Sequence, residues 1–300
     1  MSLFFYIATP EHRFADIANF NAIMRVTPEL GMVAIGATIL MVAAEFDLSV
    51  GSMFAFGGLV MAMANTWWGL GPVVGLILGV IASSLIGGLN GVIVTKVHIP
   101  SFVVTLGTSM VWRGVVLVLS HGYPILFRVD ETAPVFYQTV VGEFGFFPIQ
   151  MLWFILVTAI FWILIGYTRF GNWVAATGGN RDAARAMGVN TDRVKILCWV
   201  ILGALCGIGG AIEVTRVRSL SAEMGGSLGL ETIAAYSIGG TSLLGGVGTV
   251  VGTFVGMLLI RIIETGLLIL RLPAYWFQAF IGGMVVVGVT FNLLIDRWRS

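Results

Sequence analysis

Long apolar runs, separated by short polar connections, occupy most of the chain. Nine such runs stand out, at residues 28–44, 51–65, 73–94, 102–119, 151–167, 196–212, 232–244, 249–270 and 275–295. A helix needs about 20 apolar residues to cross the hydrocarbon of a bilayer. Most of the runs approach or reach this length, so the pattern predicts about nine membrane-spanning segments.

The uninterrupted character of these runs indicates which secondary structure they adopt. Because hydrocarbon offers no hydrogen-bond partner to backbone N–H and C=O groups, a span has to be a helix or a strand of a closed barrel. Run 73–94 is too continuously apolar for the alternating strands of a barrel. We therefore predict an all-α, polytopic transmembrane fold. The two shortest runs, 51–65 and 232–244, adjoin glycine-rich turns, as discontinuous membrane helices do.

Composition agrees with a bilayer as the solvent. The 300 residues are 58% hydrophobic and 10% charged, with a mean hydropathy of +0.98. This is more apolar surface than a water-soluble core of this length buries. The net charge is only +1 and the chain contains only two lysines, Lys96 and Lys195. Such a balance lacks the basic surface that binds nucleic acid, so nucleic acid is excluded as a partner.

Motifs for catalysis and cofactor binding are missing from the sequence. It contains no Gly-x-x-x-x-Gly-Lys-Ser/Thr phosphate loop and no Gly-x-Ser-x-Gly nucleophile motif. His12, His98 and His121 are scattered, and Cys198 and Cys206 lie in one apolar run, where core packing is the simplest interpretation. We expect no metal, no cofactor and no enzymatic activity in this chain. If ATP energises its work, another chain hydrolyses it.

The distribution of arginine and lysine predicts the orientation in the membrane. Loop 168–195 holds five of the sixteen basic residues, whereas loop 121–150, of similar length, holds only Arg128. Loops rich in basic residues stay on the cytoplasmic side. We therefore place loop 168–195 inside and loop 121–150 outside. The basic C-terminus then also lies inside, in agreement with the same rule.

A short surface helix is predicted within loop 168–195. Asn180 is a favourable N-cap, Asp182 lies in the first turn and Gly188 ends the helix. One face of this helix is small and apolar, and two arginines flank it: Ala183, Ala184, Met187, Arg181 and Arg185. Two interpretations remain open from local physics, namely docking into a groove of a soluble partner or lying on the membrane surface.

Two further segments, 44–52 and 230–248, place polar residues where apolar runs meet. The polar residues in question are Glu45, Asp47, Thr241 and Ser242. Polar groups at membrane depth are costly and usually face a cavity or a partner. A wet loop in which Asp47 caps the next helix is the alternative for the first segment.

The same two segments are weakly alike, which suggests an internal duplication. Aligning Leu48 with Leu243 also pairs Asp47 with Ser242. We predict a single transmembrane domain over residues 1–300, with repeated halves at about 1–120 and 151–300 that flank loop 121–150. The predicted topology gives the two glycine-rich segments the same orientation, so an inverted repeat requires one of the short spans to be re-entrant.

Four motifs resemble those of a known family, over residues 19–292. They are Phe-Asp-Leu-Ser-Val-Gly-Ser at 46–52, Asn-Gly at 90–91 followed by Ile-Pro-Ser-Phe-Val-Val-Thr-Leu-Gly-Thr at 99–108, Gly-Gly-Asn-Arg-Asp-Ala-Ala-Arg-Ala-Met-Gly at 178–188, and Ile-Gly-Gly-Thr-Ser-Leu-Leu-Gly-Gly-Val-Gly at 238–248. With these four motifs taken together, the sequence resembles the permease subunits of bacterial ABC importers for ribose, xylose, arabinose and related sugars.

The resemblance implies partners and a location. It implies a second permease chain (the same chain or a paralogue), an ABC ATP-binding subunit docked below and a periplasmic sugar-binding protein above, all at the inner (cytoplasmic) membrane. It makes 178–188 the coupling helix on the ATPase, and thereby favours docking for the short helix. The residues expected at this contact are Asn180, Arg181, Asp182, Ala183, Ala184, Arg185, Met187 and Gly188.

The chain departs from the family pattern at its start. Family members usually have ten spans and a cytoplasmic N-terminus, whereas here the first span is reduced to residues 3–8. Glu45 and Phe46 also replace the small or apolar residues common before Asp47. We expect about nine to ten spans in the natural protein, with a start that is truncated relative to its relatives.

Neutral donors and acceptors suit the hydroxyl groups of a sugar, and this criterion selects candidate residues of a translocation cavity. They are Asp47, Asn90, Thr105, Ser109, Thr241 and Ser242. For each of them a helix-packing hydrogen bond is the alternative role.

Two other functions compete with sugar import by alternating access. One is a branched-chain amino acid ABC permease, and the other is a secondary transporter that works without ATP.

Overall fold

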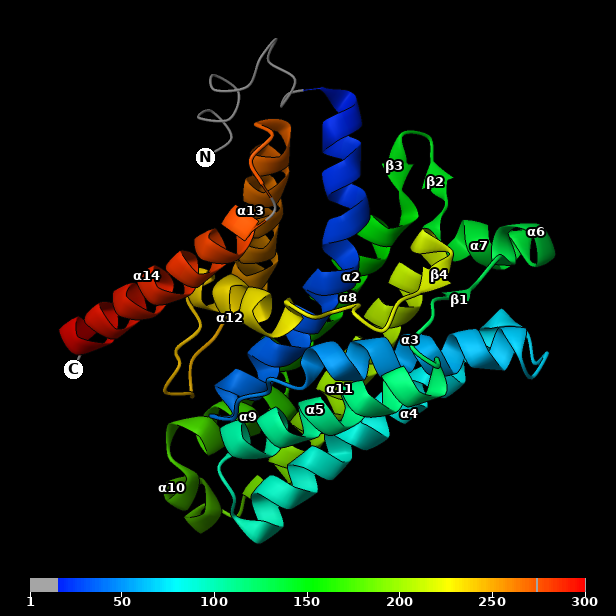
Figure 1. Cartoon of the computed structure of the whole chain (residues 1–300). Helices are drawn as coiled ribbons and strands as arrows, with labels where there is room; N and C mark the ends of the chain where they lie inside the picture. The colour runs from blue at the N-terminus through cyan, green and yellow to red at the C-terminus, as the bar shows by residue number, and fades with distance from the viewer. Residues whose placement is uncertain (1–15, 274, 300) are drawn as a thin grey trace.

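The predicted apolar runs are helical in the computed structural model, which describes residues 16–273 and 275–299 (Figure 1). The reduced first span predicted at residues 3–8 lies outside the described residues. The helices that overlap the nine runs are α2 (Ile17–Val42), α3 (Val50–Thr66), α4 (Pro72–Val92), α5 (Ser101–Leu119), α8 (Ile149–Tyr167), α11 (Thr191–Val217), α12 (Leu228–Ile238), α13 (Val250–Ile269) and α14 (Tyr275–Arg299). A π-helical turn, η2 (Ile93–Val97), extends α4.

Six of the described helices are long and apolar enough to cross a membrane. They are α2, α4 with its η2 extension, α5, α8, α11 and α13. Shorter apolar helices occupy Val50–Thr66, Leu228–Ile238 and Tyr275–Thr290. The chain is therefore an all-α, multi-pass membrane protein, as the sequence predicts.

The short run predicted at 232–244 is not one helix. Helix α12 ends at Ile238, and turns fill the connection to Val250, where α13 begins. Gly240, Gly245 and Gly246 all have φ near +80°, a conformation that favours glycine and ends regular helix. The expectation of a discontinuous element at this place is met, but the prediction of a span through residue 244 is wrong.

The connection at 121–150 contains structure of its own. It holds the short helices α6 (Val129–Thr132) and α7 (Pro134–Val141) and a hairpin of β2 (Glu143–Phe144) with β3 (Phe147–Pro148). Before them, β1 (Ile125–Leu126) pairs antiparallel with β4 (Ser219–Leu220), which directly follows α11. These two ribbons are the only sheets among the described residues.

Helix α11 is the centre of the packing and contacts α4, α3 and α2 (Figure 1). Glycines allow these close approaches, because a Cβ on Gly87 would collide with the backbone of Trp199, and one on Gly210 with that of Phe54. Helix backbones therefore pack closely at Gly87 and at Gly210. At Gly282 and Gly283 on α14, by contrast, a Cβ would meet nothing within 4 Å.

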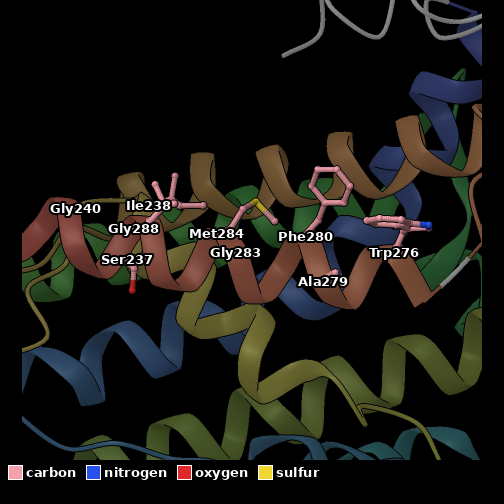
Figure 2. A pocket seen from close by; sticks show the side chains of 10 residues that line it. Ser237, Ile238, Gly240, Trp276, Ala279, Phe280, Gly283, Met284 and Gly288 are labelled. Atoms are coloured by element: carbon pink, nitrogen blue, oxygen red, sulfur yellow. The ribbon is translucent and has the colours of Figure 1, made fainter.

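Helix α14 packs mainly on α12 and reaches away from the rest of the molecule (Figure 1). Between it and the end of α12 lies an apolar groove of about 680 Å³. Trp276, Phe280 and Met284 follow one another along α14 beside this groove (Figure 2). The groove carries no ionisable lining residue, in keeping with a surface that faces lipid or a partner span.

Candidate functional site

A polar cavity of about 760 Å³ lies between helices that otherwise have apolar surfaces. Five parts of the chain contribute to it: the start of α3, the middle of α5, α11, the segment from residue 221 to the start of α12, and α14. Its lining residues are Leu48, Gly51, Ser52, Ser109, Met110, Arg113, Glu213, Glu223, Met224, Gly225, Gly226, Ser227, Gly229, Leu230 and Gln278. A concave site with a few convergent polar groups is the default candidate for ligand binding.

Loop 221–227 forms one wall of the cavity and is held in place from two sides. The Arg113 guanidinium donates from Nη1 to the carbonyl oxygens of Ala222 and Met224, the latter at 2.9 Å. Gly225 has φ +70° and lies directly against Gly51 at the start of α3, where a side chain would not fit. Arg113 therefore fixes the wall of the cavity as well as lining it.

Two hydroxyl groups of the cavity act as acceptors toward a ligand. The Ser52 hydroxyl donates to the carbonyl of Ser49 at 2.9 Å, and the Ser109 hydroxyl donates to that of Leu106 at 2.7 Å. Since each hydroxyl hydrogen is used within the chain, the two oxygens can only accept from a ligand. The cavity is consequently suited to a ligand that brings its own hydrogen-bond donors.

Buried ion pairs surround the inner side of the cavity. Arg216 on α11 donates to both carboxylate oxygens of Glu29 on α2, at 2.6 and 3.1 Å. Arg261 on α13 pairs with Glu231 on α12 and with Glu264 one turn further along α13. Buried charges are tolerated in lipid when they are paired and hydrogen-bonded. These pairs tie α2 to α11 and α12 to α13.

Of the six residues predicted to line a translocation cavity, only Ser109 lines this one. Asp47, Asn90 and Thr105 are buried in a hydrogen-bonded network around the α2–α3 connection. Its bonds run from Ser49 N and Oγ to Asp47 Oδ1 (2.5 and 2.6 Å), from Asn90 Nδ2 to Ser49 Oγ (2.9 Å) and from Leu48 N to Thr105 Oγ1 (3.1 Å). Burial raises the pKa of the Asp47 carboxyl to about 7, although the bonds from Ser49 lower it.

Thr241 and Ser242 lie in the turn between α12 and α13. Thr241 Oγ1 accepts from Thr249 N at 3.4 Å, and Ser242 N donates to the Val247 carbonyl at 2.9 Å. The turn is anchored to the end of α2, because Gly246 N donates to the Val42 carbonyl at 2.8 Å. These contacts give the two residues a structural role, and their part in transport stays a prediction.

Loop 168–195 contains two short helices, α9 (Arg169–Gly179) and α10 (Arg181–Ala186), where the sequence predicted one. The predicted ends of α10 are confirmed. Asn180 Oδ1 accepts from Ala183 N at 3.0 Å, and Gly188 has φ +85° after the helix. Helix α9 was not anticipated, because its glycines and its mixed composition give no clear helical pattern.

The predicted apolar face of α10 is only partly exposed. Met187 is 85% exposed and Ala183 is also exposed, whereas Ala184 is buried against the chain itself, with 5% exposure. Ala184 is therefore removed from the predicted contact face, on a helix that packs against α9 and α11. Met187 remains the large apolar side chain that a partner could contact.

The two arginines of α10 are engaged within the chain. Arg181 and Arg185 both pair with Asp192 Oδ1 on α11, at 2.9 and 2.5 Å, and Lys96 Nζ lies 3.2 Å from Asp192 Oδ2. Arg185 Nε also donates to Thr191 Oγ1 at 2.8 Å. Both arginines thus hold α10 onto the start of α11, and their predicted contact with an ATPase stays a prediction.

Three cavity residues, Arg113, Glu213 and Gln278, were missed by the sequence analysis. A signal was present for the first two, because Arg113 is an ionisable residue inside the apolar run 102–119 and Glu213 directly follows the run 196–212. Their convergence was not predictable, since they come from α5, α11 and α14. Among the described residues no group of three or more His, Cys, Asp or Glu could hold a metal ion.

Fold and cavity together define a multi-pass helical membrane protein with a polar internal site, and comparison with known proteins specifies its family. A family model described as the permease component of branched-chain amino acid transport systems matches residues 19–289. The chain therefore belongs to this family of transport permeases. No solved structure matches it significantly.

Curated relatives match over nearly the full chain. A xylose/arabinose import permease protein, XylH, from Sulfolobus acidocaldarius is 34% identical, covering 99% of this chain and 83% of the relative. An autoinducer 2 import system permease protein, LsrC, from Yersinia pseudotuberculosis is 33% identical, covering 96% and 81%. LsrC from Yersinia pestis is 34% identical with the same coverage. All three are named as permeases of import systems and not as enzymes.

Proposed function

We propose that this chain is the membrane permease of an ATP-binding cassette importer and forms the path for a monosaccharide of the xylose/arabinose type. A periplasmic binding protein delivers the sugar, and a separate ATPase subunit drives alternating access in the cytoplasmic membrane. A second permease chain completes the path. Support comes from the family match and from relatives named for the import of xylose/arabinose and autoinducer 2.

The observation that carries the sugar proposal is the acceptor-rich cavity. Glu213 together with the hydroxyl oxygens of Ser52 and Ser109 offers acceptors to a ligand. Sugar hydroxyls supply matching donors. The family description names branched-chain amino acids, so an amino acid is the second candidate. Its carboxylate brings only acceptors, so it could not bond to the Ser52 and Ser109 hydroxyls, which also only accept.

The contact with the ATPase is proposed at the exposed end of α10. Met187 is the large side chain presented outward at the end of α10, and Arg181 and Arg185 are both engaged in ion pairs with Asp192. An exposed apolar side chain of this kind is more stable when it docks into a groove on a soluble subunit than when it stays in water. Residues 180–188 thus act as the coupling helix through Met187, with the arginines as internal braces.

Replacing Met187 by Asp tests this contact. The change leaves the side-chain hydrogen bonds and ion pairs of α10 intact but puts a charge on the docking face, so we expect recovery of the ATP-binding subunit in a pull-down to fall about tenfold or more. Met110→Asp is not a suitable control because Met110 lines the cavity. Tyr123→Asp, on an equally exposed apolar residue in another connection, is the matched control and should leave recovery unchanged. Equal recovery with Met187→Asp would contradict the proposed contact.

A further inference from the structure

A carboxylate that receives no hydrogen bond faces the cavity from α11. Glu213 lies among the lining residues, one turn before Arg216. Arg216 uses Nε and Nη2 on the two oxygens of Glu29, and Arg261 is bound to Glu231 and Glu264. Of the residues that the structure describes, none donates a hydrogen bond to the Glu213 carboxylate or forms an ion pair with it.

The charge balance around Glu213 makes this position unusual. The neighbouring groups comprise three carboxylates, of Glu29, Glu231 and Glu264, and only two guanidiniums, of Arg216 and Arg261, each already paired with at least one of these carboxylates. Glu213 adds a carboxylate for which no cation is left. A largely buried carboxyl group without hydrogen-bond partners is costly, so its partners have to come from the contents of the cavity.

The rest of the lining indicates what kind of donor fits. Ser52 and Ser109 can only accept, because their hydrogens are bound to backbone carbonyls. A carboxylate has two oxygens with lone pairs side by side, and two neighbouring hydroxyl groups of a sugar can donate to them at the same time. A ligand carboxylate, by contrast, carries no donor for these oxygens.

We propose that Glu213 is the specificity-determining residue of the cavity and that it accepts hydrogen bonds from a pair of neighbouring hydroxyls of a polyhydroxylated, uncharged substrate. This inference rests on the proposed function and names the substrate class that the same cavity takes. Arg113 assists by holding loop 221–227 against the cavity, while Gln278 supplies an amide that can both donate and accept.

The test uses the complete complex in liposomes, with its binding protein and ATPase subunit, and radiolabelled D-xylose and L-arabinose as probes. Glu213→Gln keeps the shape of the side chain but removes its charge and one acceptor. We expect sugar uptake to fall about tenfold or more, as for the loss of a charged hydrogen bond, while assembly and ATP hydrolysis stay within about twofold. Uptake at the wild-type rate would overturn the proposal.

A matched control separates substrate contact from a general effect of removing a buried acid. Glu264 is a partly buried carboxylate of the same charge cluster, outside the cavity lining. Glu264→Gln should leave uptake within about twofold of wild type. If Glu264→Gln and Glu213→Gln lower uptake equally, Glu213 acts through the charge cluster and the proposal fails.

A second variant covers the case in which Glu213→Gln does not assemble. Glu213→Asp keeps the charge and draws the oxygens back by one methylene, so we expect it to assemble and to raise the sugar concentration for half-maximal uptake. An unchanged half-maximal concentration would contradict the inference. Failure of the proposed function shows differently: the wild-type complex would then take up leucine and neither sugar, whichever residue stands at position 213.

Discussion

Glu45 and Lys195 form an ion pair in which both side chains are buried. Lys195 Nζ lies 2.6 Å from Glu45 Oε1, and the side chains are only 8% and 10% exposed. The pair joins the α2–α3 connection, which also holds Asp47, to the first turns of α11. Glu45 departs from the residues common at this position in the resembling family, and Lys195 gives the physical reason why an acid is accommodated here.

Replacing one member of this pair should therefore be costly. Glu45→Gln leaves the Lys195 ammonium buried without a counter-charge, and we expect about 3–5 kcal/mol of destabilisation, seen as a lower melting temperature in detergent. Asp130→Asn breaks the more exposed pair with Arg218 and should cost only about 0–1 kcal/mol. Equal shifts in melting temperature for the two variants would show that the Glu45–Lys195 pair contributes no more to stability than an exposed ion pair does.

Single residues also show where sequence analysis succeeds and where it stops. The N-cap Asn180 and the helix stop Gly188 depend only on local backbone, and both were predicted correctly. Asp47 and Asn90 were selected correctly as buried polar residues, but whether such a residue faces a cavity or a neighbouring helix depends on tertiary contacts. Arg113 and Glu213 stand 100 positions apart in the chain (213 − 113), so their shared cavity could not be inferred.

At the scale of elements, Asp192 is the junction of three segments. It pairs with Arg181 and Arg185 of α10 and with Lys96 of η2, while itself lying in the first turn of α11. A helix that is to transmit force from an ATPase has to be fixed to the spans that move. Asp192 supplies that connection, so it is a positioning residue in the proposed mechanism.

Removing the charge of Asp192 should uncouple hydrolysis from transport. With Asp192→Asn we expect the number of sugar molecules imported per ATP hydrolysed to fall about threefold or more, with the ATPase still bound through Met187. The ratio is measured in proteoliposomes. Lys96→Met, which removes the most exposed of the three cations, at 61% exposure, should change the ratio little. An unchanged ratio in Asp192→Asn would argue against a positioning role.

Elements with long apolar runs were predicted well, and those with mixed composition were not. The runs at 73–94 and 102–119 match α4 and α5 closely, because length and hydropathy alone define a span. Helix α9 was missed and α12 was predicted to extend too far, since glycines can either pack within a helix or end it. Only the backbone conformation distinguishes a glycine that packs within a helix from one that ends it, as φ +81° does at Gly240.

At the scale of the whole molecule, the apolar side chains lie outside as well as inside. Helix α5 exposes Phe102, Val103, Met110, Val111 and Val118, while its polar residues Ser109 and Arg113 line the cavity. A water-soluble protein does not expose so much apolar surface. The arrangement fits a protein with lipid or partner spans around it and a polar path inside, which is what a permease requires.

The most direct test of the central claim is ATP-dependent sugar uptake by the reconstituted complex after all ion gradients have been collapsed with ionophores. The binding protein, the ATPase subunit and labelled D-xylose or L-arabinose are added to the permease in liposomes. The proposed function predicts uptake that requires ATP and the binding protein and that is unaffected by the ionophores. Uptake that persists without the ATPase subunit and vanishes with the ion gradient would contradict it.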